Sequence, residues 1–211
     1  MTNVITIERE YGCGAGAIAR SLANRLGWSL WDRELCAEIA KWLNTDVDTV
    51  ESREERLDPA FYRLVKVFMR GSYEESYSGK TLPLLDAEHL AQFFEKVIND
   101  VASRGNCVIV GRAAPWCLRN RPNTLNVFLF APPEDKIRRV MGQGKSRREA
   151  EELVEEIDKE RAAFVKKYYG KNWPSRELYH LMLNTKIGDD NVIRMILTEM
   201  DLLDKRNVAT A

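Results

Sequence analysis

The segment from Val4 to Gly27 constrains this 211-residue chain more than any other part of it. An apolar run, Val4–Ile7, is followed by a glycine-rich loop and then by an amphipathic segment that ends at Gly27. Apolar side chains recur along that segment with helical spacing, at Ile18, Ala19, Leu22 and Leu26. A strand, a glycine loop and a helix in this order can hold phosphate, because backbone N–H groups converge on the anion and the helix N-terminus adds positive potential. The first hypothesis is therefore nucleotide chemistry.

The loop lacks the cation that phosphate loops usually carry. The common pattern ends in Gly-Lys-Ser/Thr, with the lysine on the outer phosphates and the hydroxyl on magnesium. In this chain Ala15 stands at the lysine position, and Arg9 is the nearest basic substitute. A tight turn without a ligand is the alternative interpretation. On the first interpretation, the residues that bind donor phosphates are Gly12, Cys13, Gly14, Ala15, Gly16 and Ala17.

The same glycines also fit the dinucleotide fingerprint G-x-G-x-x-G/A, and Asp32 stands near the position of a ribose-binding acid. In a dinucleotide fold, however, the first glycine follows the strand at once, whereas residues 8–11 intervene here. This longer connection favours a kinase-type loop over a dinucleotide oxidoreductase.

Composition and charge exclude several classes of partner. Lys+Arg and Asp+Glu both number 32, so no net field attracts nucleic acid or an anionic membrane. No apolar run approaches the ~20 residues of a membrane span, and the first strand begins too early for a signal peptide. The 4 cysteines form no C-x-x-C pair, which argues against a zinc site and is consistent with reduced thiols. The sequence predicts a cytoplasmic protein, and it indicates no protein-ligated metal.

Short apolar runs alternate with helical patterns along the chain, which predicts an α/β fold with a parallel sheet covered on both faces. The predicted strands are Val4–Ile7, Ser29–Trp31, Cys107–Val110, Leu125–Phe130 and Leu181–Asn184. The predicted helices are Ala15–Leu26, Arg33–Leu43, Ala87–Arg104, Pro133–Gln143, Arg147–Tyr169 and Asp190–Lys205. Residues 44–86 break the alternation and are expected to form a helical insertion. In it, Tyr62 and Phe68 would contribute to an acceptor-base pocket or, alternatively, to a core or subunit contact.

Charged residues follow the second and third predicted strands. Ligands of an open parallel sheet bind beyond the carboxyl ends of its strands. Asp32 and Arg33 come after one such strand and Arg112 after another, so we expect these three to position an acceptor. A guanidinium group at such a place can grip a phosphate through two parallel hydrogen bonds. For Arg112, an ion pair with a neighbouring helix is the alternative.

A basic helix pair follows the fourth predicted strand and is expected to form a lid over about residues 138–170. Arg138 and Arg139 precede a flexible basic turn, Gly142–Lys145, and a capping box at Ser146 begins the long helix that carries Arg161. Cations on a closing lid neutralise the charge that develops in phosphoryl transfer, and closure excludes water. A solvated, salt-bridged helix pair is the alternative. On the first interpretation the catalytic residues are Arg9, Arg138, Arg139 and Arg161.

In order and in motif, the chain resembles the cytidylate kinase-like proteins among the nucleoside monophosphate kinases. Relatives read R-E-Y-G-S-G-G, V-I-V-G-R, V-F-L-x-A, D-K-x-R and Y-D-L-x-[IL]-N-T. The matching segments here are Arg9–Ala15, Val108–Arg112, Val127–Ala131, Asp158–Arg161 and Tyr179–Thr185. The chain departs from the pattern at Gly16, where relatives often carry arginine, and at His180, which replaces Asp. Cys13 stands at a serine position and is expected to fill the loop rather than to act as a nucleophile.

The resemblance implies a P-loop NTPase fold: one domain over residues 1–211, with a parallel sheet flanked by helices, a helical insertion and a lid. It also implies a kinase that uses ATP and Mg²⁺ to phosphorylate a pyrimidine nucleoside monophosphate, cytidylate first. Because the loop lysine is absent, a non-catalytic nucleotide-binding protein, a sensor or pseudo-kinase, is the alternative. Nucleotides are the expected partners. The sequence leaves the oligomeric state open, with a homodimer as one option.

Overall fold

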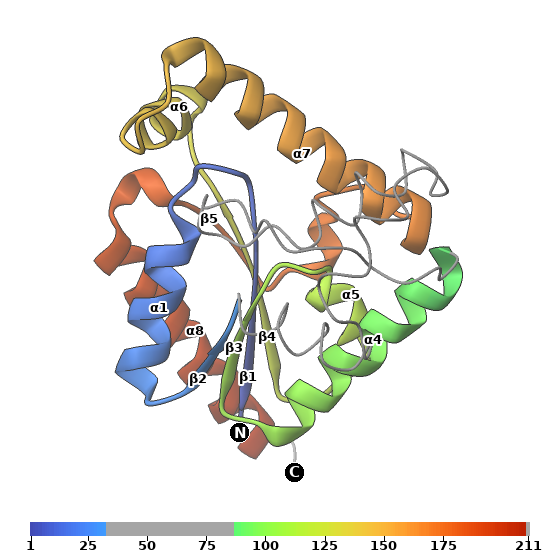
Figure 1. Ribbon diagram of the computed structural model, residues 1–211. Coiled ribbons are helices and arrows are strands. Elements are labelled where there is room, and N and C mark those ends of the chain that lie inside the picture. The colour runs from blue at the N-terminus through green and yellow to red at the C-terminus, as the bar shows by residue number, and fades with distance from the viewer. Residues whose placement is uncertain (33–86, 210–211) are drawn as a thin grey trace.

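A parallel sheet forms the centre of the computed structural model, which describes residues 1–32 and 87–209. Within these residues five strands pair in the order β2-β3-β1-β4-β5 (Figure 1). They are β1 (Val4–Arg9), β2 (Ser29–Trp31), β3 (Cys107–Val110), β4 (Thr124–Phe130) and β5 (Leu181–Asn184). The predicted helix Arg33–Leu43 and the insertion at residues 44–86, with Tyr62 and Phe68, lie outside the described residues. The observed architecture confirms the predicted α/β fold with a parallel sheet.

Helices cover both faces of the sheet, as its largely apolar strands predict. Val4 and Ile109 point to a core that is shared with α4 (Ala87–Arg104), α5 (Ala114–Cys117) and α7 (Arg147–Tyr169). Ile5 and Val108 point to the other core, against α1 (Ala15–Leu26) and α8 (Asp189–Ala209). Because successive strand side chains alternate between faces, β1, β2 and β3 contribute to both cores, whereas β4 and β5 contribute to the second.

The helix pair α6 (Pro133–Met141) and α7 lies across the carboxyl end of the sheet, where β1 leads into α1 (Figure 1). The predicted capping box is confirmed. The Ser146 side chain accepts a hydrogen bond from the Glu149 backbone N–H, and the Glu149 side chain accepts one from the Ser146 backbone N–H. Two 3-10 turns, η2 (Arg176–Leu178) and η3 (Thr185–Ile187), flank β5. Among the helices in the described ranges, none is long and apolar enough to cross a membrane.

The predicted end of β1 is wrong, and the difference matters for the loop. The strand continues through Glu8 and Arg9, because their backbones keep pairing with Phe128 and Leu129 of β4. Arg9 therefore belongs to the strand, and only residues 10 and 11 connect it to Gly12. The dinucleotide alternative fails on strand order instead. Its usual order, 3-2-1-4-5-6, makes β1 and β2 neighbours, whereas β3 separates them here.

Candidate active site

The predicted phosphate loop joins β1 to α1 with the backbone shape that an anion cradle needs. Gly12 and Gly14 both adopt left-handed conformations, with φ of +75° and +88°. The N-cap residue of α1 is Gly14, which has no side chain to cap the helix, so the N-terminus of α1 is open to an anion. A Cβ at Gly12 would lie 3.1 Å from the Lys136 carbonyl oxygen and 3.1 Å from Val140 Cγ2. Helix α6 therefore packs directly on the loop.

Cys13 fills the loop and is not placed as a nucleophile. Its side chain is buried, and this burial raises the pKa of the thiol to about 11. The potential of the helix N-terminus does not offset that desolvation, so the thiol stays protonated at neutral pH. The backbone oxygen of Cys13 accepts a hydrogen bond from the Thr185 hydroxyl at 2.7 Å.

Of the two adjacent arginines on α6, the structure brings one to the loop. A Cβ at Gly14 would lie 3.4 Å from Arg139 Nε, so that guanidinium group rests against the loop backbone. Arg138 points to solvent and pairs with Asp135 one turn away. Ile137 and Val140 are buried between α6 and α7 and fix this rotation of the helix. The site therefore receives Arg139 and not Arg138.

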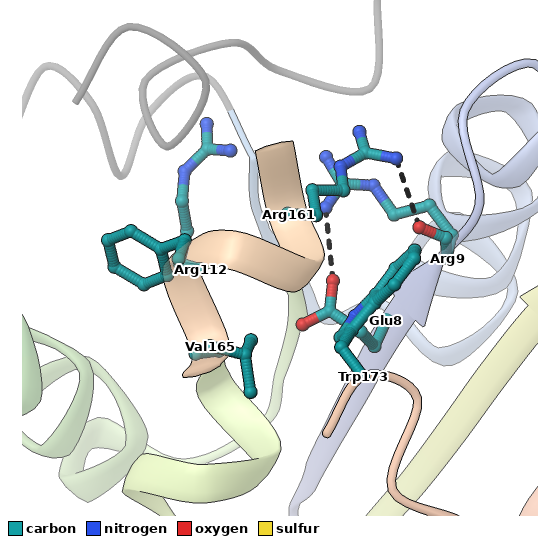
Figure 2. Close-up of a pocket in the computed structure, with 8 residues that line it drawn as sticks. Glu8, Arg9, Arg112, Arg161, Val165 and Trp173 are labelled. Atoms are coloured by element: carbon teal, nitrogen blue, oxygen red, sulfur yellow. Dashed lines mark hydrogen bonds and ion pairs between the residues drawn. The ribbon is translucent and has the colours of Figure 1, made fainter. Parts of the chain in front are cut away.

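Three predicted arginines meet in a small pocket at the carboxyl ends of β1 and β3 (Figure 2). The pocket has a volume of about 30 Å³, and we name it the arginine pocket. Its lining residues are Glu8, Arg9, Arg112, Ala113, Arg161, Phe164, Val165 and Trp173. Like-charged groups gathered in a buried place need an anion, and Glu8 supplies one at 3.4 Å from Arg9 Nη1.

Arg9 is the most deeply buried of the three arginines in the arginine pocket. The residue is 3% exposed, and its Nε and Nη2 atoms are buried with no hydrogen-bond partner among the described residues. Burial, with the nearby charges of Arg161 and Arg112, lowers the pKa of Arg9 to about 10, against the opposing charges of Glu8 and Asp32. The group is still cationic at neutral pH, and it has two nitrogen donors to offer an anion.

Two of the predicted acceptor residues, Asp32 and Arg112, lie just beyond the ends of strands. Asp32 directly follows β2 and is 2% exposed, and its charge acts on Arg9. Arg112 is 4% exposed and has a left-handed backbone, with φ of +64°, which turns the chain from β3 toward α5. Arg33 lies outside the described residues. The structure thus brings Asp32 and Arg112 to one site.

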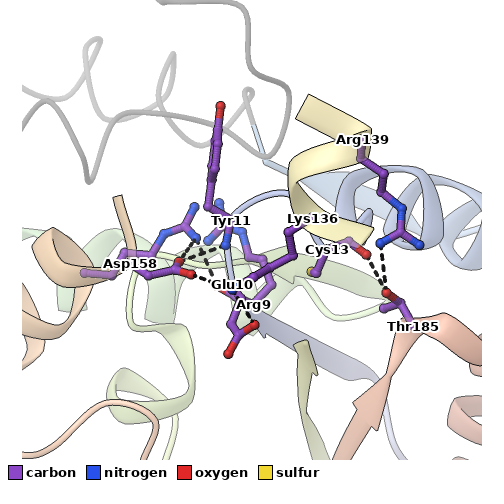
Figure 3. A network of polar contacts seen from close by, with 9 residues as sticks. Arg9, Glu10, Tyr11, Cys13, Lys136, Arg139, Asp158 and Thr185 are labelled. Carbon is purple, nitrogen blue, oxygen red and sulfur yellow. Dashed lines mark hydrogen bonds and ion pairs between the residues drawn. The ribbon is translucent and has the colours of Figure 1, made fainter. Parts of the chain in front are cut away.

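A polar network ties the connection between β1 and the loop to helices α6 and α7 (Figure 3). The Tyr11 backbone N–H donates to Asp158 Oδ1 at 2.8 Å, and Lys136 Nζ reaches Glu10 at 2.9 Å and Asp158 at 3.4 Å. Arg161 Nη1 donates to Asp158 and to the Arg9 carbonyl oxygen, each at 3.1 Å. Burial raises the pKa of Asp158, while Arg161 and Lys136 oppose that rise. The helix pair therefore holds residues 9–11 in place.

Sequence reasoning missed several residues of this site. Lys136 was invisible because its partners Glu10 and Asp158 come from distant segments, whereas Glu8 pairs with its sequence neighbour Arg9. Asp158 and Thr185 lie inside two of the motifs that the chain shares with the family, and this shared pattern was the signal that could have identified them. His180 is explained by the fold, since its Nδ1 accepts the Asn126 N–H at 2.9 Å.

The site fits a nucleoside triphosphate better than it fits a protein-ligated metal. The cradle offers N–H groups and the Arg139 guanidinium group to phosphate, but Gly16 and Ala17 provide no hydroxyl for Mg²⁺. In residues 1–32 and 87–209, no three His, Cys, Asp or Glu side chains gather in a metal-binding group. Mg²⁺ often binds through substrate phosphates, water and one carboxylate, and Glu8 and Asp32 are buried carboxylates at this edge.

A model of the cytidylate kinase-like family matches residues 4–187. A cytidylate kinase from Aeropyrum pernix is 35% identical over 101 residues, which is 46% of this chain and 58% of that protein. The match therefore spans less than two thirds of the relative's length.

Solved structures show the same fold. An uncharacterized protein from Eubacterium ventriosum has a TM-score of 0.68 at 24% identity, covering 95% of this chain and 99% of that one. A gluconokinase from Sinorhizobium meliloti has a TM-score of 0.56 at 12% identity, with 99% and 97% covered. A shikimate kinase from Acinetobacter baumannii, in complex with shikimate, has a TM-score of 0.52 at 17% identity, with 95% and 93% covered.

Proposed function

Because this chain belongs to the cytidylate kinase-like family, we propose that it is an ATP-dependent nucleoside monophosphate kinase with cytidylate as its first candidate acceptor. The observation that carries the proposal is the convergence of Arg9, Arg112 and Arg161 beside a glycine cradle. Phosphoryl transfer asks a protein mainly for positioning and for cations around the transferred group. A site with two phosphate-binding halves meets that demand.

The donor half is the cradle from Gly12 to Ala17. Its backbone N–H groups would hold the donor phosphates, and Arg139 would supply the positive charge that the absent lysine normally provides. When bound, Mg²⁺ would offset charge on the outer phosphates. Arg139 reaches the cradle from α6, whereas the usual lysine belongs to the loop itself, so donor binding depends on where α6 lies.

The acceptor half is the arginine pocket together with Asp32. Arg112 and Arg9 would grip the acceptor phosphate, and Arg161 would neutralise charge between the two substrates. Phosphoryl transfer then breaks the bond from the γ-phosphorus to the bridging oxygen and forms one to an acceptor phosphate oxygen. Asp32 and Arg33 would orient the rest of the acceptor.

A non-catalytic nucleotide sensor is the second candidate. The specific observation in its favour is the loop itself, which has alanine where lysine stands in working phosphate loops. In that case the same cradle binds nucleotide, and the buried network around Asp158 transmits occupancy to α6 and α7. The two candidates differ in turnover and not in binding.

Thermal stability and turnover, measured together, test the proposal. We expect ATP with Mg²⁺ to raise the melting temperature while NAD does not, since a ligand of the native state raises apparent stability. Cytidylate should then be phosphorylated faster than other nucleoside monophosphates. Stabilisation by NAD alone would contradict the proposal of a kinase. Binding of ATP without phosphorylation of any nucleoside monophosphate would instead favour the non-catalytic nucleotide sensor.

Replacing Arg112 by alanine separates the two halves of the site. We expect the dissociation constant for the monophosphate to rise by the equivalent of about 1.5–3 kcal/mol, the usual loss for a charge-assisted hydrogen-bond pair. The constant for ATP should change far less. Calorimetric titration measures both, and Arg148→Ala is the control because that arginine is exposed on α7. Equal weakening of both ligands would place Arg112 outside the acceptor half.

A further inference from the structure

Thr185 is a buried hydroxyl that links three separate parts of the chain. It begins η3 directly after β5, and its side chain is 1% exposed. The hydroxyl donates to the Cys13 carbonyl oxygen at 2.7 Å and accepts from Arg139 Nη1 at 3.3 Å (Figure 3). The end of β5, the phosphate loop and α6 therefore meet at one oxygen atom.

The two hydrogen bonds of this hydroxyl depend on each other. A hydroxyl has one proton to donate, and Thr185 gives it to a carbonyl oxygen of the loop. Its lone pairs are then directed away from the loop carbonyl, and one of them receives the Arg139 guanidinium group. Threonine has a stiff side chain, so the position of the oxygen follows from the backbone at the start of η3.

Arg139 has little else to fix it. Within residues 1–32 and 87–209, Thr185 is the one hydrogen-bond partner that its guanidinium group has. The other face of that group lies against Gly14, where a Cβ would come within 3.4 Å of Nε and 3.5 Å of Cζ. A long, half-buried side chain without such a partner would sample several rotamers.

We infer that Thr185 is a positioning residue, which holds Arg139 against the phosphate loop so that an arginine from α6 serves where the loop lysine is missing. The inference rests on the proposed function in one respect, that the donor phosphates occupy the cradle. A preorganised cation binds phosphate without first losing conformational freedom, and its charge is aimed before the transferred group develops charge. Thr185 acts through Arg139 and does not touch the nucleotide.

A matched pair of variants isolates the hydroxyl. Thr185→Val keeps the shape and loses both hydrogen bonds, whereas Thr185→Ser keeps the oxygen. We expect Thr185→Val to raise the dissociation constant for ADP about tenfold and to lower kcat/KM for ATP by a similar factor, the effect of one well-placed hydrogen bond. Thr185→Ser should stay within about twofold of the wild type. Thr198→Val is the control, since its hydroxyl bonds only its own helix on the exposed side of α8.

A double-mutant cycle with Arg139→Ala shows whether the effect passes through the arginine. If Thr185 positions Arg139, Thr185→Val should have almost no further effect on ADP affinity once Arg139 is gone. Additive effects would mean that Thr185 supports the loop only through Cys13, and they would overturn the inference while leaving the kinase proposal intact. A wild type that binds ADP, shows the coupling and has no turnover would support the inference and refute the kinase. A lack of any effect of Thr185→Val on ADP affinity would also overturn the inference.

Discussion

Replacing Arg9 by alanine is expected to lower kcat by about 10²- to 10³-fold, comparable to removing one preorganised donor from a charged transition state. The reason lies in the burial of this group. Arg9 is 3% exposed, and its Nε and Nη2 have no hydrogen-bond partner among the described residues. A buried donor without a partner is costly, so an anion that enters the arginine pocket gains the full strength of both bonds.

The measurement is steady-state turnover with ATP and the preferred monophosphate, accompanied by calorimetric titration of ATP alone. Affinity for ATP should persist, because the cradle holds the donor through backbone N–H groups and Arg139. Arg9→Lys keeps a charge but loses the planar fork, so it should recover only part of the rate. If Arg9→Ala weakened ATP binding and left kcat unchanged, Arg9 would belong to the donor half. If the wild type did not turn over at all, the sensor would be the better function.

The sheet was predictable because its strands carry their own signal. The run Cys107–Val110 is apolar throughout and the other runs are mostly apolar, and burial on both faces of a parallel sheet favours that pattern. The end of β1 carried no such signal. Glu8 and Arg9 are charged, and only their pairing with β4, far away in sequence, keeps them in the strand. Helix α5 spans 4 residues, too short for any periodicity to appear.

Parts of the site were predictable for a topological reason. Parallel strands present their carboxyl ends at one edge, so Asp32 and Arg112 could be assigned to one region before any contact was known. The choice between Arg138 and Arg139 was not predictable in the same way. It depends on the rotation of α6 against the loop and α7, which the packing of Ile137 and Val140 sets. Thr185 lay in a quoted motif, but the hydrogen bond of its hydroxyl to the loop could not be predicted, because it depends on the position of the end of β5 beside the loop.

Replacing Gly111 by alanine is expected to displace the Arg9 guanidinium group in the arginine pocket and so to lower kcat by about 10²-fold. Gly111 follows β3 and has φ of +70°. A Cβ there would lie 1.8 Å from Arg9 Nη1 and 2.8 Å from Arg9 Cζ, so the guanidinium group cannot keep its position. Glu8 and Arg161 line the same pocket, so a shift of the Arg9 guanidinium group changes the arrangement of charges in it. The absence of a Cβ at Gly111 therefore leaves the space that the Arg9 guanidinium group occupies.

The variant should lose stability and activity for separable reasons. A left-handed backbone costs a residue with a Cβ about 1–2 kcal/mol, whether or not Arg9 is present. Gly27→Ala is the matched control: Gly27 has φ of +64° at the end of α1, and nothing lies within 4 Å of a Cβ built there. It should show a similar loss in the free energy of unfolding, measured by denaturant titration, with kcat unchanged.

The same substitution in the Arg9→Ala background decides what the glycine accommodates. Once the guanidinium group is absent, Gly111→Ala has nothing to displace, so kcat should fall no further than in Arg9→Ala alone. The loss in the free energy of unfolding should remain, because backbone strain does not depend on Arg9. If Gly111→Ala lowered kcat equally in both backgrounds, the glycine would serve the backbone turn toward Arg112 rather than the placement of Arg9. Non-additive kinetics with additive stability is thus the result that assigns Gly111 to the positioning of Arg9.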